Sequence, residues 1–199
     1  MVMGLGQLKE LKLEACEDLK DVVSDFKDQW SPVFPRLSKV ELKCLSKLKS
    51  IESLFSLSSS KNLEKLKLLR LCSCKELKEV IWGDKDENVS TIFPQMKCLV
   101  LKDLPKLVNF SQYNGTFDWP NLQTVRVSNV PSMKTFSTGN LNTPVLRSID
   151  ITFVKKLWLE NLNETISFIH NNSGRNATAC CFSLPIMTLL AMNSTYVID

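Results

Sequence analysis

The sequence predicts a repeat solenoid of the α/β class, built from short strands joined by irregular connections and short helical turns. Three observations lead to this prediction. An apolar pattern of six positions recurs along the chain, its centre alternates as a β-strand does, and prolines stand at a fixed place before several copies. With 199 residues, 44% of them hydrophobic, the chain is long enough to bury a core shared by the copies.

The repeated pattern has the form L-x-x-L-x-L-x-x-[C/L/V]-x-x-L-x-x-φ, where φ is apolar. Its copies begin 24 to 30 residues apart, at Leu8, Leu37, Leu66, Met96, Leu122 and Leu146. A single x-L-x-L-x strand cannot bury its apolar side alone, so successive copies are expected to stack as a parallel sheet over one core. We therefore expect a curved leucine-rich-repeat horseshoe of about six repeats, with the parallel sheet on its concave face.

Prolines and polar segments agree with this division of the chain. Pro35, Pro94, Pro120 and Pro144 each lie two residues before a copy begins, where a strand tolerates the missing N–H. The polar segments between copies are expected to form coil, turns and single helical turns. Residues 1–159 are predicted to be the repeat domain, and residues 160–199 a divergent C-terminal cap or a poorly ordered tail.

The residues between the strand leucines are candidates for binding a protein partner. Alternation places one of them per copy in a row across the concave face: Lys12, Glu41, Arg70, Val100, Arg126 and Asp150. Leu68 and Cys98, together with Cys72, add apolar side chains near the middle of that face, where a partner could place its anchoring residues. The alternative is a solvated surface whose opposite charges, such as Glu10 beside Lys39 and Glu14 beside Lys43, keep neighbouring strands compatible.

Lysines just past each strand predict a basic rim. They are Lys20, Lys47, Lys49, Lys75, Lys78, Lys106, Lys134, Lys155 and Lys156. If equivalent positions stack, these side chains form a basic stripe that either is solvated or docks on an acidic protein surface.

Several phrases resemble a known family, the leucine-rich-repeat region of plant intracellular nucleotide-binding disease-resistance proteins of the coiled-coil type. The resemblance rests on the L-x-L-x-x-C-x-x-L form of residues 11–19 and 69–77, on the Phe-Pro entries at Phe34 and Phe93, and on the Leu-Pro-Lys-Leu and Trp-Pro-Asn-Leu phrases at residues 104–107 and 119–122. It covers roughly residues 6–169. It implies a cytoplasmic receptor segment with a sensing and autoinhibitory role, whose partner is a pathogen effector, a guarded host protein or a neighbouring nucleotide-binding domain.

Other function classes find little support in the sequence. No phosphate-binding loop is present, and His170 is the single histidine, so we expect no enzyme activity, cofactor, metal or small-molecule substrate. A formal net charge of +4 is too weak for a nucleic-acid binder. The sequence also lacks a signal peptide and an apolar run long enough to span a membrane.

Two alternatives remain open at this point. Similar repeats occur behind an F-box in substrate adaptors of ubiquitin ligases. Seven Asn-x-Ser/Thr sequons, at Asn88, Asn109, Asn114, Asn163, Asn171, Asn176 and Asn193, are compatible with a secreted glycoprotein.

Overall fold

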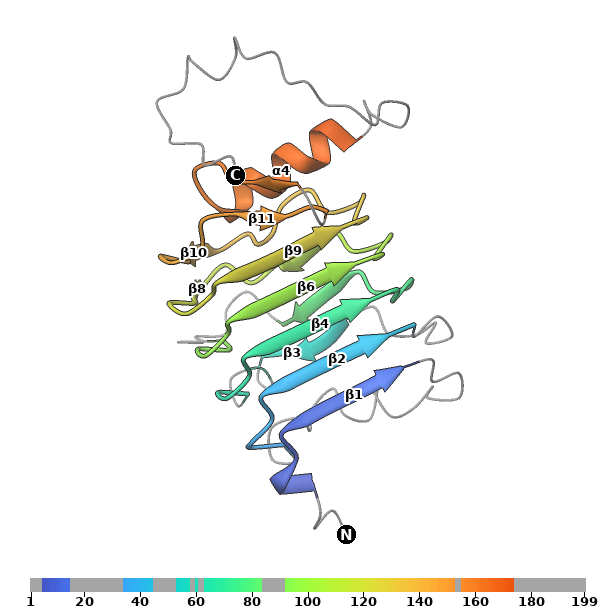
Figure 1. The fold of residues 1–199 in the computed structure, drawn as a ribbon, viewed down its shortest axis with the longest axis vertical. Helices are drawn as coiled ribbons and strands as arrows, with labels where there is room; N and C mark the ends of the chain where they lie inside the picture. The colour runs from blue at the N-terminus through green and yellow to red at the C-terminus, as the bar shows by residue number, and fades with distance from the viewer. Residues whose placement is uncertain are drawn as a thin grey trace.

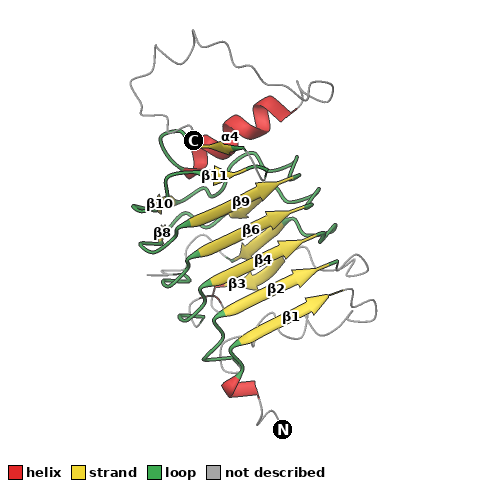
Figure 2. Cartoon of the chain, in the orientation of Figure 1, coloured by secondary structure: helices red, strands yellow, loops and turns green. Residues whose placement is uncertain are grey.

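The structure is a computed structural model. It describes residues 5–14, 34–44, 53–57, 60, 63–83, 92–152 and 155–173. Figure 2 shows the secondary structure of these residues, which consists mainly of strands and loops.

A seven-stranded sheet is the largest element of the fold (Figure 1). Its neighbouring strands run parallel, except that the last strand runs antiparallel to the one before it. In spatial order the strands are β1 (Glu10–Glu14), β2 (Lys39–Lys43), β4 (Leu68–Cys72), β6 (Cys98–Lys102), β9 (Thr124–Ser128), β11 (Ile149–Asp150) and β12 (Lys156–Leu157).

The register of this sheet follows from the repeated apolar positions. Leu11 pairs with Val40, and the row continues through Leu69, Leu99, Val125 and Ile149. From Val40 onward each of these side chains is fully buried, whereas Leu11 on the edge strand is half-buried. A shift of one residue would turn every one of these side chains to the opposite face, so burial of the row fixes the register.

The chain segments that connect the strands of the large sheet form two smaller sheets. Strands β3 (Ser53–Ser56), β5 (Glu79–Trp82) and β7 (Asn109–Ser111) make a parallel three-stranded sheet, which lies behind the large sheet in Figure 1. Strands β8 (Thr116–Asp118) and β10 (Asn140–Asn142) make a parallel pair. The core lies between these layers, since buried residues of both, such as Leu69 and Ile81, belong to one cluster.

Aromatic side chains fill the C-terminal half of this core. Phe110 stacks on Phe136 with ring centroids 4.8 Å apart, and it meets Trp119 edge-on at 5.5 Å. The indole Nε1–H of Trp119 donates a 2.8 Å hydrogen bond to the carbonyl of Ile92, so its polar atom is satisfied. Each such ring contributes about 1.5 to 3 kcal/mol through burial, with a further contribution from ring contacts.

The residue directly after each of the strands β2, β4, β6 and β9 lies in the left-handed backbone region. Cys44, Ser73, Asp103 and Asn129 have φ between 53° and 56° and follow β2, β4, β6 and β9. The N–H groups of the first three donate to carbonyls of the next strand, at 2.9 to 3.0 Å. Asn and Asp tolerate this conformation better than most residues, and Asn129 also donates a 2.9 Å hydrogen bond to the Asp103 carboxylate.

Two helical segments lie toward the ends of the chain. The 3-10 turn η1 (Leu5–Gln7) precedes β1, and helix α4 (Leu162–Ser173) follows β12 near β11 in Figure 1. Asn161 caps α4, because its Oδ1 accepts the N–H of Glu164 at 2.9 Å. Leu162 and Ile166 are buried in the common core. Residues 174–199, within the predicted tail, lie outside the described residues.

The predicted fold class, a curved leucine-rich-repeat horseshoe, is contradicted by this arrangement. The large sheet is mixed, because β12 is antiparallel to β11. The segments between copies, expected as coil and helical turns, contain strands β3, β8 and β10, and strands β5 and β7 begin at the ends of copies. Among the described residues one α-helix, α4, has complete bounds. The observed class is a large, mostly parallel sheet with two small parallel sheets and a terminal helix.

The residue types of the connections explain this correction. Val80 and Ile81 in β5, Phe110 in β7 and Phe117 in β8 are β-branched or aromatic, and such residues favour strands when neighbours can pack on them. Successive connections run side by side because the large sheet already aligns them. Their backbone groups therefore pair with each other, as Ile81 does with Ser111, instead of closing helical turns.

Candidate protein-binding face

One side of the large sheet, here called the outward face, carries the side chains that point away from the core. Because side chains alternate along a strand, three residues of each five-residue strand point outward. We call the nine outward residues of β4, β6 and β9 the central face. They are Leu68, Arg70, Cys72, Cys98, Val100, Lys102, Thr124, Arg126 and Ser128.

The structure brings all eight predicted concave-face residues onto the outward face. Six of them form a single row in register across the sheet, which runs Lys12, Glu41, Arg70, Val100, Arg126, Asp150. Leu68 and Cys98 are neighbours in the adjacent row. That these residues bind a protein stays a prediction.

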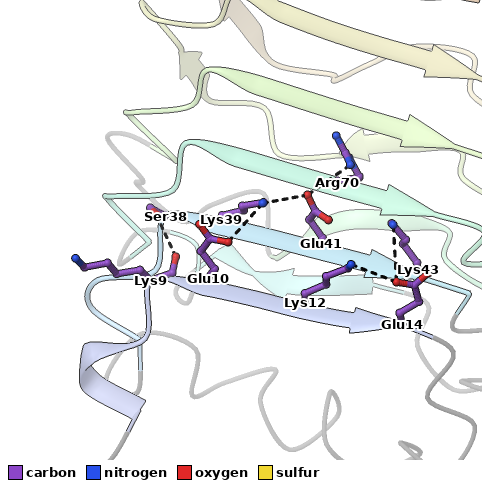
Figure 3. Close-up of polar contacts among 9 residues, drawn as sticks. All are labelled: Lys9, Glu10, Lys12, Glu14, Ser38, Lys39, Glu41, Lys43 and Arg70. Carbon is purple, nitrogen blue, oxygen red and sulfur yellow. Dashed lines mark hydrogen bonds and ion pairs between the residues drawn. The ribbon is translucent and has the colours of Figure 1, made fainter.

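Ion pairs neutralise the part of this face that lies over β1 and β2 (Figure 3). Lys39 Nζ lies 3.4 Å from Glu10 Oε2 and 3.5 Å from Glu41 Oε1, and Lys43 Nζ lies 3.8 Å from Glu14 Oε2. The predicted pairs Glu10 with Lys39 and Glu14 with Lys43 are thus formed. Most of these side chains are exposed, so each pair contributes at most about 1 kcal/mol.

Glu41 differs from the other acids because its side chain is only 9% exposed. Two cations share its carboxylate: Lys39 Nζ and Arg70 Nη1 each lie 3.5 Å from Oε1. A buried carboxylate without such partners would carry a large desolvation cost. Arg70 therefore offsets part of the desolvation cost of Glu41, and this ion pair holds the Arg70 side chain toward β2.

A second arginine on the central face is held in the opposite direction. Arg126 Nη2 lies 3.1 Å from Asp150 Oδ2, on the strand beyond it. Arg70 and Arg126 flank Val100 in register, and Val100 is only 5% exposed. Long arginine side chains cover apolar neighbours with their methylene groups while the charged ends stay solvated. Val100 therefore supports the two arginines and offers a partner little surface of its own.

The two half-buried thiols of the central face behave as small apolar groups. Burial raises the pKa of Cys98 and of Cys72, although nearby cations such as Arg70 act in the opposite direction. Both side chains therefore stay protonated at neutral pH. Cys74, two residues after Cys72, is buried in the core, so the two thiols belong to opposite sides of the sheet.

The predicted basic rim is not one continuous stripe. Lys20, Lys47 and Lys49 lie outside the described residues. Backbone hydrogen bonds place Lys78, Val108 and Lys134 in one column, and Val108 interrupts its charge. Lys106 Nζ lies 2.7 Å from Glu76 Oε2 in a different column.

The other lysines of the rim also fall away from that column. Lys75 is exposed in the turn before β5, at another repeat position. Lys155 and Lys156 lie at or in β12, the antiparallel strand, where Lys156 pairs in register with Asp150. The chain reverses there, so these two lysines do not continue the rim.

Sequence reasoning left several outward residues out of the predicted site. Lys39 and Lys43 complete the ion pairs around Glu41 and Glu14, and Lys102, Thr124 and Ser128 complete the central face. The signal that could have found them was present, because the same alternation that selected one column per copy also defines its two flanking columns.

One sequon, Asn109, is poorly placed to carry a glycan, and the side chain of another, Asn163, is held by hydrogen bonds. Asn109 is only 5% exposed. The Oδ1 atom of Asn163 accepts hydrogen bonds from the N–H groups of Phe136 and Ser137, at 3.0 and 2.9 Å, and from the Thr135 hydroxyl at 3.1 Å. These bonds fix the position of the Asn163 side chain.

Within the ranges that the structure describes, no helix has the length and apolar character needed to span a membrane. The same ranges hold no cluster of three or more potential metal-ligating side chains. Comparisons of the chain with protein-family models, with curated proteins and with solved structures found no match. The resemblance to plant receptors and the function that it implies therefore stay predictions.

Proposed function

We propose that this chain is a protein-binding segment without catalytic activity, and that it binds its partner through the outward face of the large sheet. One observation carries the proposal. The nine positions of the central face hold three cations and no carboxylate, and the acids that pair with these cations, Glu41, Asp103 and Asp150, all lie outside it. Half-buried Leu68, Cys72 and Cys98 lie among these cations.

A surface of this composition suits a protein partner. Interfaces commonly combine apolar side chains, arginines and a polar surround, and arginine is among the residues that contribute most to binding. The backbone beneath is a hydrogen-bonded sheet, so its side chains are held at fixed spacing. Such a platform supports recognition of a partner surface with little loss of conformational entropy.

For the biological role, we propose the sensing and autoinhibitory part of a cytoplasmic plant immune receptor. The support is the resemblance of the repeated phrases, for example Leu69 to Leu77, to that family. Its partner would be a pathogen effector, a guarded host protein or a neighbouring nucleotide-binding domain. The upstream reading frame tests this role directly: a phosphate-binding loop there supports it, and an F-box there contradicts it in favour of a ubiquitin-ligase adaptor.

The binding proposal is tested with a library of plant proteins displayed on yeast and selected against the full chain. Leu68→Asp places a charge among the apolar residues of the central face, and we expect it to abolish capture of the selected partners. Lys65→Asp, at an exposed position in the turn before β4, is the matched control and should leave capture unchanged. Equal capture by both variants, with the native circular dichroism spectrum retained, would contradict the proposal.

A further inference from the structure

The positions of the two central arginines suggest what chemistry the partner presents. They stand on either side of β6, and neighbouring strands are about 4.8 Å apart, so their backbones are separated by about 10 Å. Arg70 is drawn outward by Glu41 and Arg126 by Asp150, at 3.5 and 3.1 Å. The middle of the central face is thus bordered by positive charge on both sides, with no acid on β6.

An arginine has five N–H donors, and the described acid that pairs with Arg70 is Glu41. Nε of Arg70 is buried and makes no hydrogen bond to any described residue, and a buried donor without an acceptor is unfavourable. Its guanidinium therefore retains donor capacity that Glu41 does not use. The Arg70 side chain is 34% exposed, so a small rotation would let it donate a hydrogen bond to a second carboxylate.

A small apolar area lies next to the arginines. Leu68 and Cys98 face each other across β4 and β6, in the row next to Arg70 and Val100, and both side chains are half-buried. Cys98 pairs in register with Leu68 on one side and with Thr124 on the other, so it lies between the strands that carry the two arginines. The neutral thiol and the leucine together leave a small apolar area beside the positive charge.

We infer that the central face binds a protein segment that places an acidic side chain between Arg70 and Arg126 and an adjacent apolar side chain over Leu68 and Cys98. This inference rests on the proposed function and specifies its partner. Guanidinium groups recognise carboxylates through paired N–H donors, which gives the contact geometric specificity as well as charge.

An extended polyanion such as a nucleic acid fits this face less well. Glu10, Glu14 and Glu41 lie on one side of the central face and Asp150 on the other. A phosphate chain crossing the sheet would meet these carboxylates after passing the arginines. A single acidic side chain, by contrast, meets only the positive centre.

The test selects a random peptide library on phage against the full chain. We expect the selected peptides to share an Asp or Glu next to an apolar residue. A synthetic peptide of the consensus sequence is then titrated by fluorescence anisotropy. Its affinity should fall about tenfold or more for the R70Q/R126Q variant, and by less than about twofold for R36Q/K65Q, which removes the same charge from exposed positions in the turns before β2 and β4.

The outcomes separate this inference from the proposed function. Selection that yields no binding peptide would count against both. Peptides that lack an acid, or that bind R70Q/R126Q as tightly as the unchanged chain, would overturn the inference alone. So would a single-stranded oligonucleotide that binds with higher affinity than the peptide and depends on the same arginines. If R70Q/R126Q does not fold, a peptide with its acid changed to the amide replaces it, and undiminished binding of that peptide also overturns the inference.

Discussion

Replacing Arg70 by Gln is expected to destabilise the fold through Glu41 more than through lost surface charge. The Glu41 side chain is only 9% exposed, and it shares its carboxylate between Arg70 and Lys39 (Figure 3). In the Arg70→Gln variant Lys39 remains as the one described cation that pairs with this acid, and its side chain is itself 36% exposed. Part of the desolvation cost of Glu41 then goes uncompensated.

The distances set the size of this effect. Opposite unit charges at 3.5 Å attract by about 5 kcal/mol at an effective dielectric constant of about 20. Solvation of the 34% exposed Arg70 and the remaining contact with Lys39 offset most of this attraction. We expect a net loss of about 1 to 2 kcal/mol in the free energy of unfolding, the lower part of the range for a charge pair with one buried partner.

The assay is urea denaturation followed by circular dichroism, applied to a double-mutant cycle of Arg70→Gln and Glu41→Gln. The double variant should recover about 1 kcal/mol relative to additivity, because neither charge is then left alone. Lys43→Gln is the control, since its partner Glu14 is 51% exposed, and it should change stability by less than about 0.5 kcal/mol. A loss for Arg70→Gln no larger than for Lys43→Gln would refute this account of Glu41.

Three further predictions concern other parts of the molecule. Phe110→Ala should lower the free energy of unfolding by about 3 to 5 kcal/mol, because it opens a cavity in the aromatic core, and Phe110→Leu by clearly less; equal losses in urea denaturation would contradict this packing. Asn163→Ala should lower the free energy of unfolding by about 2 kcal/mol in the same assay, because it leaves the N–H groups of Phe136 and Ser137 without their acceptor. Asn163→Asp keeps an oxygen at that place and should cost less, so a larger loss for Asp than for Ala would speak against a role for these hydrogen bonds. Burial raises the pKa of Glu79 above its ordinary value of 4.5, although the N–H of Gln112 partly opposes this shift. The stability linked to this group is therefore present below its unfolded pKa and is lost as pH rises through its folded pKa. Thermal unfolding between pH 4 and 7 should thus show Glu79→Gln gaining stability relative to the unchanged chain as pH rises, and a constant difference would argue against the shift.

The six parallel strands of the large sheet could be predicted from the sequence because their signal is local, whereas the antiparallel β12 was not predicted. Leu69 and Leu71, with Arg70 between them, already define a strand with one buried side, and the same pattern in the next copy sets the register. The second sheet could not be predicted in this way. Ile81 and Ser111 become neighbours only after β4 and β6 have aligned, so their pairing depends on contacts between distant residues.

The candidate face shows the same limit. Its members follow from alternation alone, and the structure brings them onto one side of the sheet. Their exposure does not follow, because it depends on the side chains of adjacent strands. Val100 was expected to offer apolar surface, yet it is 5% exposed between two arginines. The interruption of the basic rim by Val108 likewise depends on which connection residues become neighbours.

The connections of the fold differ in length without disturbing either sheet. The chain from β2 to β3 is longer than those from β4 to β5 and from β6 to β7, and still β3 pairs in register with β5. Insertions at this place can therefore accumulate while the spacing of Glu41, Arg70 and Arg126 stays the same. Engineered loops or tags inserted after Cys44 should leave the proposed partner selectivity intact, and single substitutions can change the proposed binding face independently of these connections.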